Sequence, residues 1–576
     1  MEYSAIVHFA DKRFAYALEN GNFLFRLEAK KGDLKRVVMH FMDKYVPLKY
    51  EDTRDSVEMY LLGSDRYKDY FEVELSFDMI CMRYCFELED REGMVQFFGN
   101  HMFFDQKPTE LDCMFDCPKN LRVEEIFSTP DWAKNKVVYQ IFPSSFASSH
   151  NPSPEEWYQK PMDYKTRLHG DLKGIKEHLP YLRDLGIDVI YMTPVFKAPS
   201  NHKYDTEDYY QLDPDFGTNE DLKELVNAAH ALNIRVILDG VFNHTSTRFF
   251  AFLDILKNQE NSEYKDFYYI NHFPLETAKE FHQRNEKRYQ TFSYFSGMPK
   301  LNLSSKKVQD YILDVAKYWV KECHIDGWRL DVGDEISHSF WKRFRKEMKD
   351  FSPDLLIVGE IWHFAGDFLE GDEWDSVMNY QFYQSVQSLV ASGTMKVSEF
   401  VERQMFMAGH VNSGALPLLW NLMGSHDTAR FYHNCGKEER KLMLGASLML
   451  LNPGMPMIYY GDEVGMDGGA DPDCRRGMLW DEKRQNATVL KHYKACIKVR
   501  HELPAITQGR VVWRFVDDEA GILMERRRYQ EEEVVLIFHC KDGETKVLES
   551  EGKKNLLNNR TGNGILSGYE TFVYCP

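Results

Sequence analysis

Carboxyl groups that follow short apolar runs are the residues of this sequence best placed to do chemistry. Asp331 closes GWRLD, Glu360 closes LLIVGE, and Asp427 follows LWNLMGSH. Carboxyl groups can act as nucleophiles, and they can transfer protons to and from a substrate. Each of them, taken alone, is more often a helix cap or a solvated loop residue. The inference therefore depends on whether the three acids converge.

Residue spacing gives two of these acids a chemical environment. Arg329 and Asp331 are two residues apart, so their side chains project from the same face of a strand. The guanidinium could orient the Asp331 carboxylate and keep it ionised, although a purely structural ion pair is the alternative. Trp362 follows Glu360 by two residues, and aromatic surface beside a carboxyl raises its pKa, as a general acid requires. Ordinary packing of Trp362 is the alternative there.

Two further segments combine acids with histidines. DGVFNH places Asp239 and His244 five residues apart, so we expect His244 in the loop after a strand. GSHD pairs His426 with Asp427, which offers a neutral donor beside an acid for gripping adjacent hydroxyl groups. Packed or capped histidines and plain loop hydrogen bonds are the alternatives.

The elements that would position these residues form a repeating pattern. Short apolar runs alternate with amphipathic stretches, which predicts a (β/α)8 TIM barrel whose parallel strands are buried. Active sites of such barrels form at the carboxyl ends of the strands, and five of the eight runs carry acids there, the eighth with Asp462 and Glu463. The runs are VVYQIF, DVIYM, VILDGV, DGWRLD, LLIVGE, DSVMN, LWNLMGSHD and MIYYGDE.

The fold class predicted for the whole chain is a multidomain α/β protein. The barrel is expected over residues 126–502, with a small inserted subdomain at about 245–303 after its third strand. Alternating apolar and polar stretches predict an N-terminal β-sandwich at 1–125 and a C-terminal β-sandwich at 503–576. Within the first, FEVELSF and ICMRYCFEL are expected to form a hairpin, and Val123 to Pro130 the linker to the barrel.

Composition limits the partners. The chain has 576 residues, and 71 basic against 90 acidic residues give a net charge of −19. An acidic chain repels polyphosphates and anionic membranes, so we expect no nucleic-acid partner and no membrane. The opening MEYSAIVHFADKRF does not resemble a signal peptide, no run of eighteen apolar residues occurs, and the ten cysteines lack zinc-site spacing. We therefore expect a cytoplasmic protein with reduced thiols.

Four segments together resemble the signature regions of the α-amylase family of glycoside hydrolases. They are DGVFNH, GWRLDVGDE, EIWH and MGSHD, in that order, each at the end of a predicted barrel strand. MPKLN (298–302) is similar to a fifth region of the neopullulanase, cyclomaltodextrinase and maltogenic amylase group. HKYDTEDYY (202–210) and DPDCRRGMLWD (471–481) resemble further segments of that group, whose domain plan is the one predicted above.

The resemblance implies a role for each matching residue. Asp331 corresponds to the nucleophile, Glu360 to the acid/base, and Asp427 to a carboxylate that grips sugar hydroxyls and stabilises the transition state. The remaining candidates support these acids or contact sugars on either side of the cleavage point; they are His202, Tyr204, Asp239, His244, Met298, Arg329, Trp362, His426, Asp471 and Arg475.

The implied reaction is hydrolysis of α-1,4 glucosidic bonds with retained configuration, through a covalent glycosyl-enzyme on Asp331. Cyclodextrins, maltooligosaccharides, pullulan and starch are the candidate substrates, and cleavage of α-1,6 bonds stays open. A transglycosylase or isomerase on the same barrel is the alternative, followed by a non-catalytic carbohydrate-binding protein. Members of the group often dimerise through the N-terminal sandwich, so a homodimer is expected.

Two departures from the group bear on function. Gly333 and Asp334 follow Val332 where the group usually has Val-Ala-Asn, which leaves the acceptor preference open. The loop SSFASSHNPSP after the first barrel strand offers few ionised oxygens, and hard cations require several. We therefore expect no required cofactor and no metal at that loop, while calcium elsewhere stays open.

Overall fold

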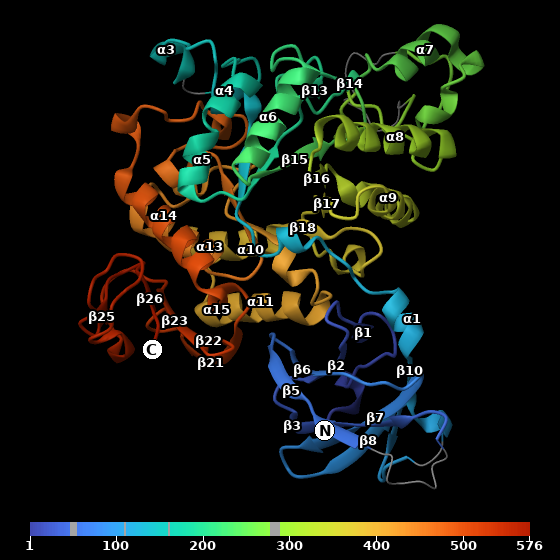
Figure 1. Ribbon diagram of the computed structural model, residues 1–576, viewed down its shortest axis with the longest axis vertical. Helices are drawn as coiled ribbons and strands as arrows, with labels where there is room; N and C mark the ends of the chain where they lie inside the picture. Colours follow the sequence, from blue (N-terminus) through green and yellow to red (C-terminus); the bar gives the residue numbers. More distant parts are fainter. Residues whose placement is uncertain (47–54, 109–110, 159–161, 277–287) are drawn as a thin grey trace. The chain divides into compact units, whose positions relative to one another are not determined.

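The computed structural model describes residues 1–46, 55–108, 111–158, 162–276 and 288–576 (Figure 1). The chain forms two compact units. Unit 1 comprises residues 1–129 together with two later segments, 366–372 and 398–416, and unit 2 comprises the remaining 130–365, 373–397 and 417–576.

Unit 1 is built on two antiparallel sheets. One has the order β1-β2-β6-β5, and the other has the order β4-β3-β7-β8-β9, with β10 also pairing with β7. The strands are β1 (Ala15–Ala17), β2 (Phe23–Lys30), β3 (Leu34–Asp43), β4 (Asp55–Glu58), β5 (Tyr60–Ser64), β6 (Lys68–Leu75), β7 (Cys81–Asp90), β8 (Val95–Gly99), β9 (Met102–Phe104) and β10 (Phe115–Pro118), followed by helix α1 (Lys119–Glu124).

The hairpin predicted from FEVELSF and ICMRYCFEL is wrong. These runs form β6 and β7, but β6 pairs with β2 and β5, whereas β7 pairs with β3, β8 and β10. The chain therefore crosses from one sheet to the other between them. Alternation shows that one face of a strand is buried, but it does not identify the strand's partner.

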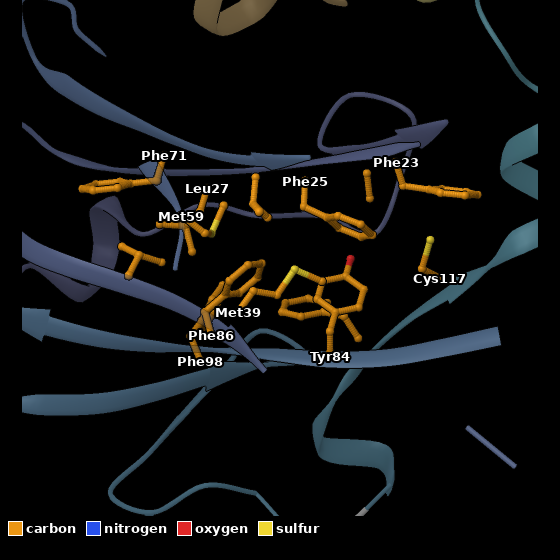
Figure 2. Packing of buried hydrophobic residues seen from close by; sticks show 14 of the residues in the cluster. Phe23, Phe25, Leu27, Met39, Met59, Phe71, Tyr84, Phe86, Phe98 and Cys117 are labelled. Atoms are coloured by element: carbon orange, nitrogen blue, oxygen red, sulfur yellow. The ribbon is translucent and has the colours of Figure 1, made fainter. Parts of the chain in front are cut away.

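Both sheets of unit 1 contribute to one apolar core. Figure 2 shows Phe23 and Phe25 of β2 on one side of this core, and Tyr84 and Phe86 of β7 on the other. All four side chains are at most 1% exposed. Burying an aromatic side chain of this size stabilises the fold by about 1.5–3 kcal/mol, so the contact between the sheets is a major source of stability for this unit.

Unit 2 contains a closed parallel barrel, and the predicted fold class is confirmed. Each barrel strand coincides with one of the eight apolar runs. In order around the barrel they are β11 (Val138–Ile141), β12 (Val189–Met192), β15 (Arg235–Gly240), β16 (Gly327–Leu330), β17 (Leu356–Gly359), β18 (Ser376–Asn379), β19 (Trp420–Leu422) and β20 (Met455–Tyr459).

Helices connect most of the consecutive barrel strands. Because helices cover the outer face while side chains fill the interior, the strands are buried on both faces and read as continuous apolar runs. Apart from α7, which is described below, the α-helices in this part of the sequence are α2 (Pro143–Phe146), α3 (Pro154–Trp157), α4 (Leu172–Glu177), α5 (Leu179–Leu185), α6 (Asn219–Ala231), α8 (Lys306–Cys323), α9 (His338–Phe351), α10 (Tyr380–Val386), α11 (Val397–His410), α12 (Phe431–Asn434), α13 (Glu439–Leu450) and α14 (Ala487–Glu502).

The segment between β15 and α8 is long and mostly irregular. It holds α7 (Phe250–Asn258) and a short strand-like bridge between Thr291 and Pro299. Residues 277–287 of the predicted inserted subdomain lie outside the described residues. A second short sheet pairs β13 (Phe196–Lys197) with β14 (Asp208–Leu212).

The C-terminal part of unit 2 is again antiparallel. After α15 (Pro504–Thr507), a four-stranded sheet has the order β21-β22-β23-β26, and β24 pairs separately with β25. The strands are β21 (Arg510–Asp517), β22 (Ile522–Tyr529), β23 (Glu532–His539), β24 (Thr545–Lys546), β25 (Ile565–Leu566) and β26 (Thr571–Tyr574).

Among the described residues, no helix combines the length and apolar character needed to cross a bilayer.

Candidate active site

A cavity of about 410 Å³ is bounded by residues that follow the carboxyl ends of the barrel strands. The structure brings ten of the thirteen predicted site residues to its wall, and Asp239, Arg329 and His426 contact those residues from behind. The lining residues are Tyr164, His202, Tyr204, His244, Phe292, Met298, Asp331, Val332, Asp334, Glu360, Trp362, Asp427, Asp471 and Arg475.

Arg329 joins three carboxylates at the base of this cavity. Its Nη1 lies 3.0 Å from Asp239 Oδ1 and 3.0 Å from Asp331 Oδ1. Its Nη2 lies 2.8 Å from Glu360 Oε1, an ion pair without hydrogen-bond alignment. Asp239 and Arg329 are direct neighbours in the β15–β16 register. The Arg329 side chain is fully buried, so its charge is unscreened by water and fixes the positions of all three acids.

The charges of this cluster do not balance. Burial and the nearby Glu360 carboxylate raise the pKa of Asp331, while Arg329 opposes the rise. Burial raises the pKa of Asp239 to about 6, against the effects of Arg329 and Tyr191. The predicted contact between Arg329 and Asp331 is present, and the same cation also serves Asp239 and Glu360. Burial therefore favours the protonated forms of Asp239 and Asp331, against the effect of Arg329.

Asp331 and Glu360 differ in their hydrogen bonds. Glu360 Oε2 accepts from the Val332 backbone N–H at 3.0 Å, and Oε1 accepts from Trp362 Nε1 at 3.2 Å. Trp362 therefore offers Glu360 a donor, and its ring stacks on that of Tyr380 with the two centroids 3.9 Å apart. Asp331 Oδ2 has no hydrogen-bond partner among the described residues. This buried oxygen is thus the one that Arg329 leaves unpaired, on a residue that lines the cavity.

A chain of hydrogen bonds orients Tyr204 beside the acids. Gln140 Nε2 donates to His426 Nδ1 at 2.8 Å, which assigns the histidine proton to Nε2. His426 Nε2 contacts the Tyr204 hydroxyl, and that hydroxyl donates to Asp239 Oδ2 at 3.0 Å. The Tyr204 and His426 rings are nearly parallel, at an interplanar angle of 4°. Tyr204 thus presents a fixed aromatic surface to the cavity.

The histidines of the site are neutral. Burial lowers the pKa of His244 to about 3 and of His202 to about 4, and it holds the pKa of His426 well below its usual range. His244 Nε2 is buried and has no partner among the described residues, although it lines the cavity. A neutral imidazole nitrogen without a partner can exchange a hydrogen bond with a hydroxyl group of a ligand.

Asp427, Asp471 and Arg475 form a second charged group in the wall. Arg475 Nη2 lies 2.9 Å from Asp471 Oδ1 and 3.4 Å from Asp427 Oδ1, while its Nε donates to the His426 carbonyl at 2.9 Å. Asp427 Oδ2 lies 3.2 Å from His426 Nε2. Burial raises the pKa of Asp427 despite Arg475. The arrangement holds one carboxylate between a cation and a neutral donor.

Sequence reasoning missed four lining residues, Tyr164, Phe292, Val332 and Asp334. Val332 and Asp334 lie within the GWRLDVGDE segment that drew attention to the nucleophile candidate. Tyr164 and Phe292 come from irregular segments without periodicity, so no local signal marked them.

The unusual glycine after the nucleophile candidate has a packing reason. A Cβ at Gly333 would lie 2.7 Å from Cζ2 of Trp374, which is closer than real Cβ atoms approach another heavy atom. The Gly333 carbonyl also accepts from Trp341 Nε1 at 2.8 Å. Alanine, the residue usual in the resembled group, does not fit here against Trp374.

Asp171 has a structural role beside the loop that follows β11. Asp171 accepts hydrogen bonds from the Ser149 and Gly174 backbone N–H groups at 3.0 and 2.7 Å, so it caps α4 and fastens the loop. Among the described residues, no group of three or more histidine, cysteine, aspartate or glutamate side chains is arranged to hold a metal ion.

Comparison with known proteins assigns the family. Residues 140–509 match the family described as "Alpha amylase, catalytic domain", and residues 1–119 match "Alpha amylase, N-terminal ig-like domain". The chain belongs to the α-amylase family. As a member of this family, it is a glycoside hydrolase that acts on α-glucosidic bonds.

Relatives within the α-amylase family match nearly the whole chain. Neopullulanase 2 of Thermoactinomyces vulgaris is 38% identical and is matched over 97% of this chain and 95% of its own length. A cyclomaltodextrinase of Geobacillus thermopakistaniensis is 39% identical over 99% of this chain and 97% of its own length. A solved structure named cyclomaltodextrinase superposes with a TM-score of 0.89 at 35% identity, covering 95% of this chain and 93% of that one.

Proposed function

We propose that this α-amylase family member hydrolyses α-1,4 bonds of cyclodextrins and short maltooligosaccharides with retention of configuration, through a covalent glycosyl-enzyme on Asp331. The observation that carries the proposal is the single guanidinium of Arg329, which contacts Asp331 at 3.0 Å and Glu360 at 2.8 Å. It places two carboxyl groups with different hydrogen-bonding environments side by side in one cavity.

In the first step, Glu360 acts as the general acid and donates a proton to the glycosidic oxygen. Asp331 Oδ2, which has no partner among the described residues, attacks the anomeric carbon. The carbon–oxygen bond to the leaving sugar breaks, and an ester bond to Asp331 forms. Glu360 then takes a proton from water, the resulting hydroxide attacks the same carbon, and the Asp331 carboxylate departs.

The arrangement of the two acids favours retention. Retaining glycosidases keep their carboxyl groups about 5–5.5 Å apart, whereas inverting enzymes need about 6.5–9.5 Å to admit a water molecule. Asp331 and Glu360 contact the two amino ends of one planar guanidinium, which holds them close together. Two displacements at the same carbon, each with inversion, give net retention.

The other polar residues have supporting roles in this proposal. Asp427, held between Arg475 and His426, accepts hydrogen bonds from sugar hydroxyls near the anomeric carbon. The unpartnered Nε2 of His244 contacts another hydroxyl, and Tyr204 stacks on the sugar. Because the three histidines are neutral, they do not oppose the positive charge that develops on the sugar ring.

The names of the relatives support the substrate class. They include neopullulanase, cyclomaltodextrinase and maltogenic α-amylase. The test is a product profile on β-cyclodextrin, pullulan and soluble starch, with the anomeric configuration of the first product followed by NMR. We expect α-products and faster turnover of β-cyclodextrin than of starch. Initial β-products would contradict retention, and dominant longer or rearranged products would support the alternative transglycosylase or isomerase.

We also propose that neither the hydrolytic activity nor the folded structure requires a metal ion. The chemistry above needs a proton donor, a nucleophile and one internal cation, all supplied by side chains. We expect dialysis against EDTA to leave the rate on β-cyclodextrin and the unfolding temperature unchanged. Loss of either property, restored by calcium but not by magnesium, would indicate a calcium site.

A homodimer and a cytoplasmic location also belong to this proposal. The location is supported by a relative named intracellular maltogenic amylase, from Bacillus subtilis, which is 35% identical over 94% of this chain. Light scattering across a dilution series tests the dimer, since a single protomer mass at all concentrations would exclude it. Cell fractionation tests the location, and activity outside the cytoplasmic fraction would contradict it.

A further inference from the structure

Gln140 is a buried amide behind the catalytic cavity that has no part in the reaction as proposed above. It lies on β11, in register with Tyr191 of β12 and Tyr459 of β20. Val138, two residues earlier, packs with Tyr191 in the apolar cluster inside the barrel. Because side chains two residues apart on a strand share a face, Gln140 points into the same interior. Its side chain is fully buried there.

The Gln140 amide uses one of its two polar ends. Its Nε2 donates to His426 Nδ1 at 2.8 Å, whereas its Oε1 is buried without a hydrogen-bond partner among the described residues. Burying an unpaired carbonyl oxygen lowers the stability of a protein. Stability therefore does not explain an amide at this position, and its hydrogen bond to His426 is the feature that a function would use.

The neighbours of His426 Nε2 require a proton on that atom. The Tyr204 hydroxyl contacts Nε2 and donates its own proton to Asp239 Oδ2 at 3.0 Å, so its oxygen is left to accept from Nε2. Asp427 Oδ2 lies 3.2 Å from the same nitrogen, and a carboxylate can only accept. Nε2 must therefore donate, and a neutral imidazole then has a lone pair on Nδ1 that needs a donor.

Gln140 meets this need without adding charge. An amide donor pairs with the Nδ1 lone pair and does not ionise, so the ring keeps one proton, on Nε2. Burial also favours the neutral ring, and it holds the pKa of His426 well below its usual range. A neutral donor beside the sugar does not oppose the positive charge that develops on the sugar ring in the proposed reaction.

We propose that Gln140 is a positioning residue for the reaction, which fixes the proton of His426 on Nε2 and makes that atom a permanent donor to Tyr204 and Asp427. The inference rests on the proposed function and adds to it a residue that does not line the cavity. Its effect passes through the imidazole to a tyrosine ring and a carboxylate in the cavity wall.

The experiment measures the pH dependence of kcat in Gln140→Glu, a change that keeps the shape of the side chain. At low pH the introduced carboxyl and His426 share one proton, in addition to the proton on Nε2. When the shared proton is lost at higher pH, the introduced carboxylate accepts from Nδ1, and Nε2 is left without a proton. We expect kcat to fall about tenfold as pH rises through this ionisation.

The substrate for this measurement is α-maltosyl fluoride. Its leaving group needs no proton from Glu360, so the ionisation of Glu360 as an acid does not mask the effect. The wild type should lack the fall in kcat, because the Gln140 amide does not ionise.

Two further variants show whether Gln140 acts through the imidazole. Gln140→Met removes the donor without introducing an ionisable group, so kcat should fall at every pH and gain no new dependence on pH. In His426→Ala, which lacks the imidazole, adding Gln140→Glu should cause no further loss and no fall with pH, because the two changes affect one contact. Equal losses from Gln140→Glu in the two backgrounds would overturn the inference.

Asn555→Asp is the matched control. Asn555 is 0% exposed, as Gln140 is, and its Nδ2 donates to the Thr571 carbonyl at 3.1 Å in the C-terminal part of unit 2. The change again replaces a buried amide donor by an acid, so it should lower the unfolding temperature without altering the pH dependence of kcat.

A wild-type pH profile in Gln140→Glu overturns the inference and leaves the proposed function intact. If that variant does not fold, wild-type kcat in Gln140→Met overturns it instead. Failure of the wild-type enzyme to hydrolyse either α-maltosyl fluoride or β-cyclodextrin counts against the proposed function.

Discussion

At the scale of single residues, the site depends on an unequal sharing of charge. Arg329 is the cation for Asp239, Asp331 and Glu360, and it is fully buried. Glu360 has two further donors, whereas Asp331 Oδ2 has none among the described residues. One acid is thus held in place by its partners while the other keeps a free oxygen, which suits an acid/base and a nucleophile respectively.

Azide can separate these two roles. In Asp331→Ala, azide should occupy the space of the lost carboxylate and attack the anomeric carbon directly, giving a β-glycosyl azide from an activated α-glucosyl substrate. In Glu360→Ala, azide should instead attack the glycosyl-enzyme and give the α-product. Both variants should lose at least about 10⁴-fold in kcat on β-cyclodextrin without azide. The same azide anomer from both variants would contradict the assignment.

The pH dependence of glycosyl-enzyme formation should reveal the electrostatic effect of Glu360 on Asp331. Glu360 raises the pKa of Asp331, so removing its charge should lower that pKa. Asp331 must be ionised to attack, so the rate of glycosyl-enzyme formation rises with pH through its pKa. In Glu360→Gln, we expect this rise to move to lower pH.

α-Maltosyl fluoride is the suitable substrate for this measurement, because fluoride departs without a general acid. The control is Glu335→Gln, since Glu335 is bonded to Lys300 and does not line the cavity. It should leave the acid limb of the profile in place. A limb that stays at the wild-type pH in Glu360→Gln would show that the two carboxyls titrate independently.

At the scale of elements, the sequence predicts well which segments form the barrel strands. It predicts poorly which strands pair with one another in unit 1. Burial on both faces makes each barrel strand a continuous apolar run, so all eight were recognisable. In unit 1, β6 and β7 alternate in the same way, and nothing in that alternation says that they lie in different sheets. The place of Asp239 beside Arg329 depends on strand register, and Tyr164 lies in an aperiodic loop. Neither position could be derived from local sequence.

The turn after β16 offers a test of packing. Gly333→Ala would place a methyl group 2.7 Å from the Trp374 ring, which is too large and rigid to give way. We expect the free energy of unfolding of the barrel to fall by about 1–3 kcal/mol, with a further loss of activity because Asp331 lies two residues earlier. Thermal unfolding, followed by calorimetry, measures the stability change.

Gly424→Ala is the matched control for this substitution. Its added Cβ would have its nearest neighbour, Thr428 Oγ1, at 3.5 Å, an ordinary contact distance. It should change stability far less than Gly333→Ala. Combining Gly333→Ala with Trp374→Leu should cost less than the sum of the two single changes, because the smaller side chain relieves the overlap. Strict additivity would mean that the overlap is not the cause.

At the scale of the whole molecule, unit 1 is not a simple N-terminal segment. Residues 398–416, from between two barrel strands, belong to it. Arg26 donates to the Ala408 carbonyl at 3.1 Å and also contacts the Gly409 carbonyl, and the Tyr16 hydroxyl lies 3.1 Å from Ser413 Oγ. Deleting the first 125 residues would expose this segment, so point variants are the better probes of unit 1.

Arg26→Ala is such a probe. Arg26 is 2% exposed and forms an ion pair with Glu72, which is 3% exposed, so the substitution strands a carboxylate inside the unit. Breaking a buried pair on one side costs about 3–5 kcal/mol. We expect unit 1 to unfold at a lower temperature in calorimetry. Below that temperature, turnover of maltotriose by unit 2 should persist, because every residue of the catalytic cavity belongs to unit 2.

Two further variants decide whether the unpaired Glu72 carboxylate causes the lower unfolding temperature of Arg26→Ala. Arg13→Ala removes a guanidinium from an exposed pair with Asp11 in the same unit, and exposed pairs contribute about 0–1 kcal/mol, so its unfolding should barely change. Adding Glu72→Gln to Arg26→Ala removes the unpaired charge and should recover part of the loss. If the double variant is as unstable as Arg26→Ala, the lost hydrogen bonds to residues 408 and 409 explain the effect instead, since they are absent from both.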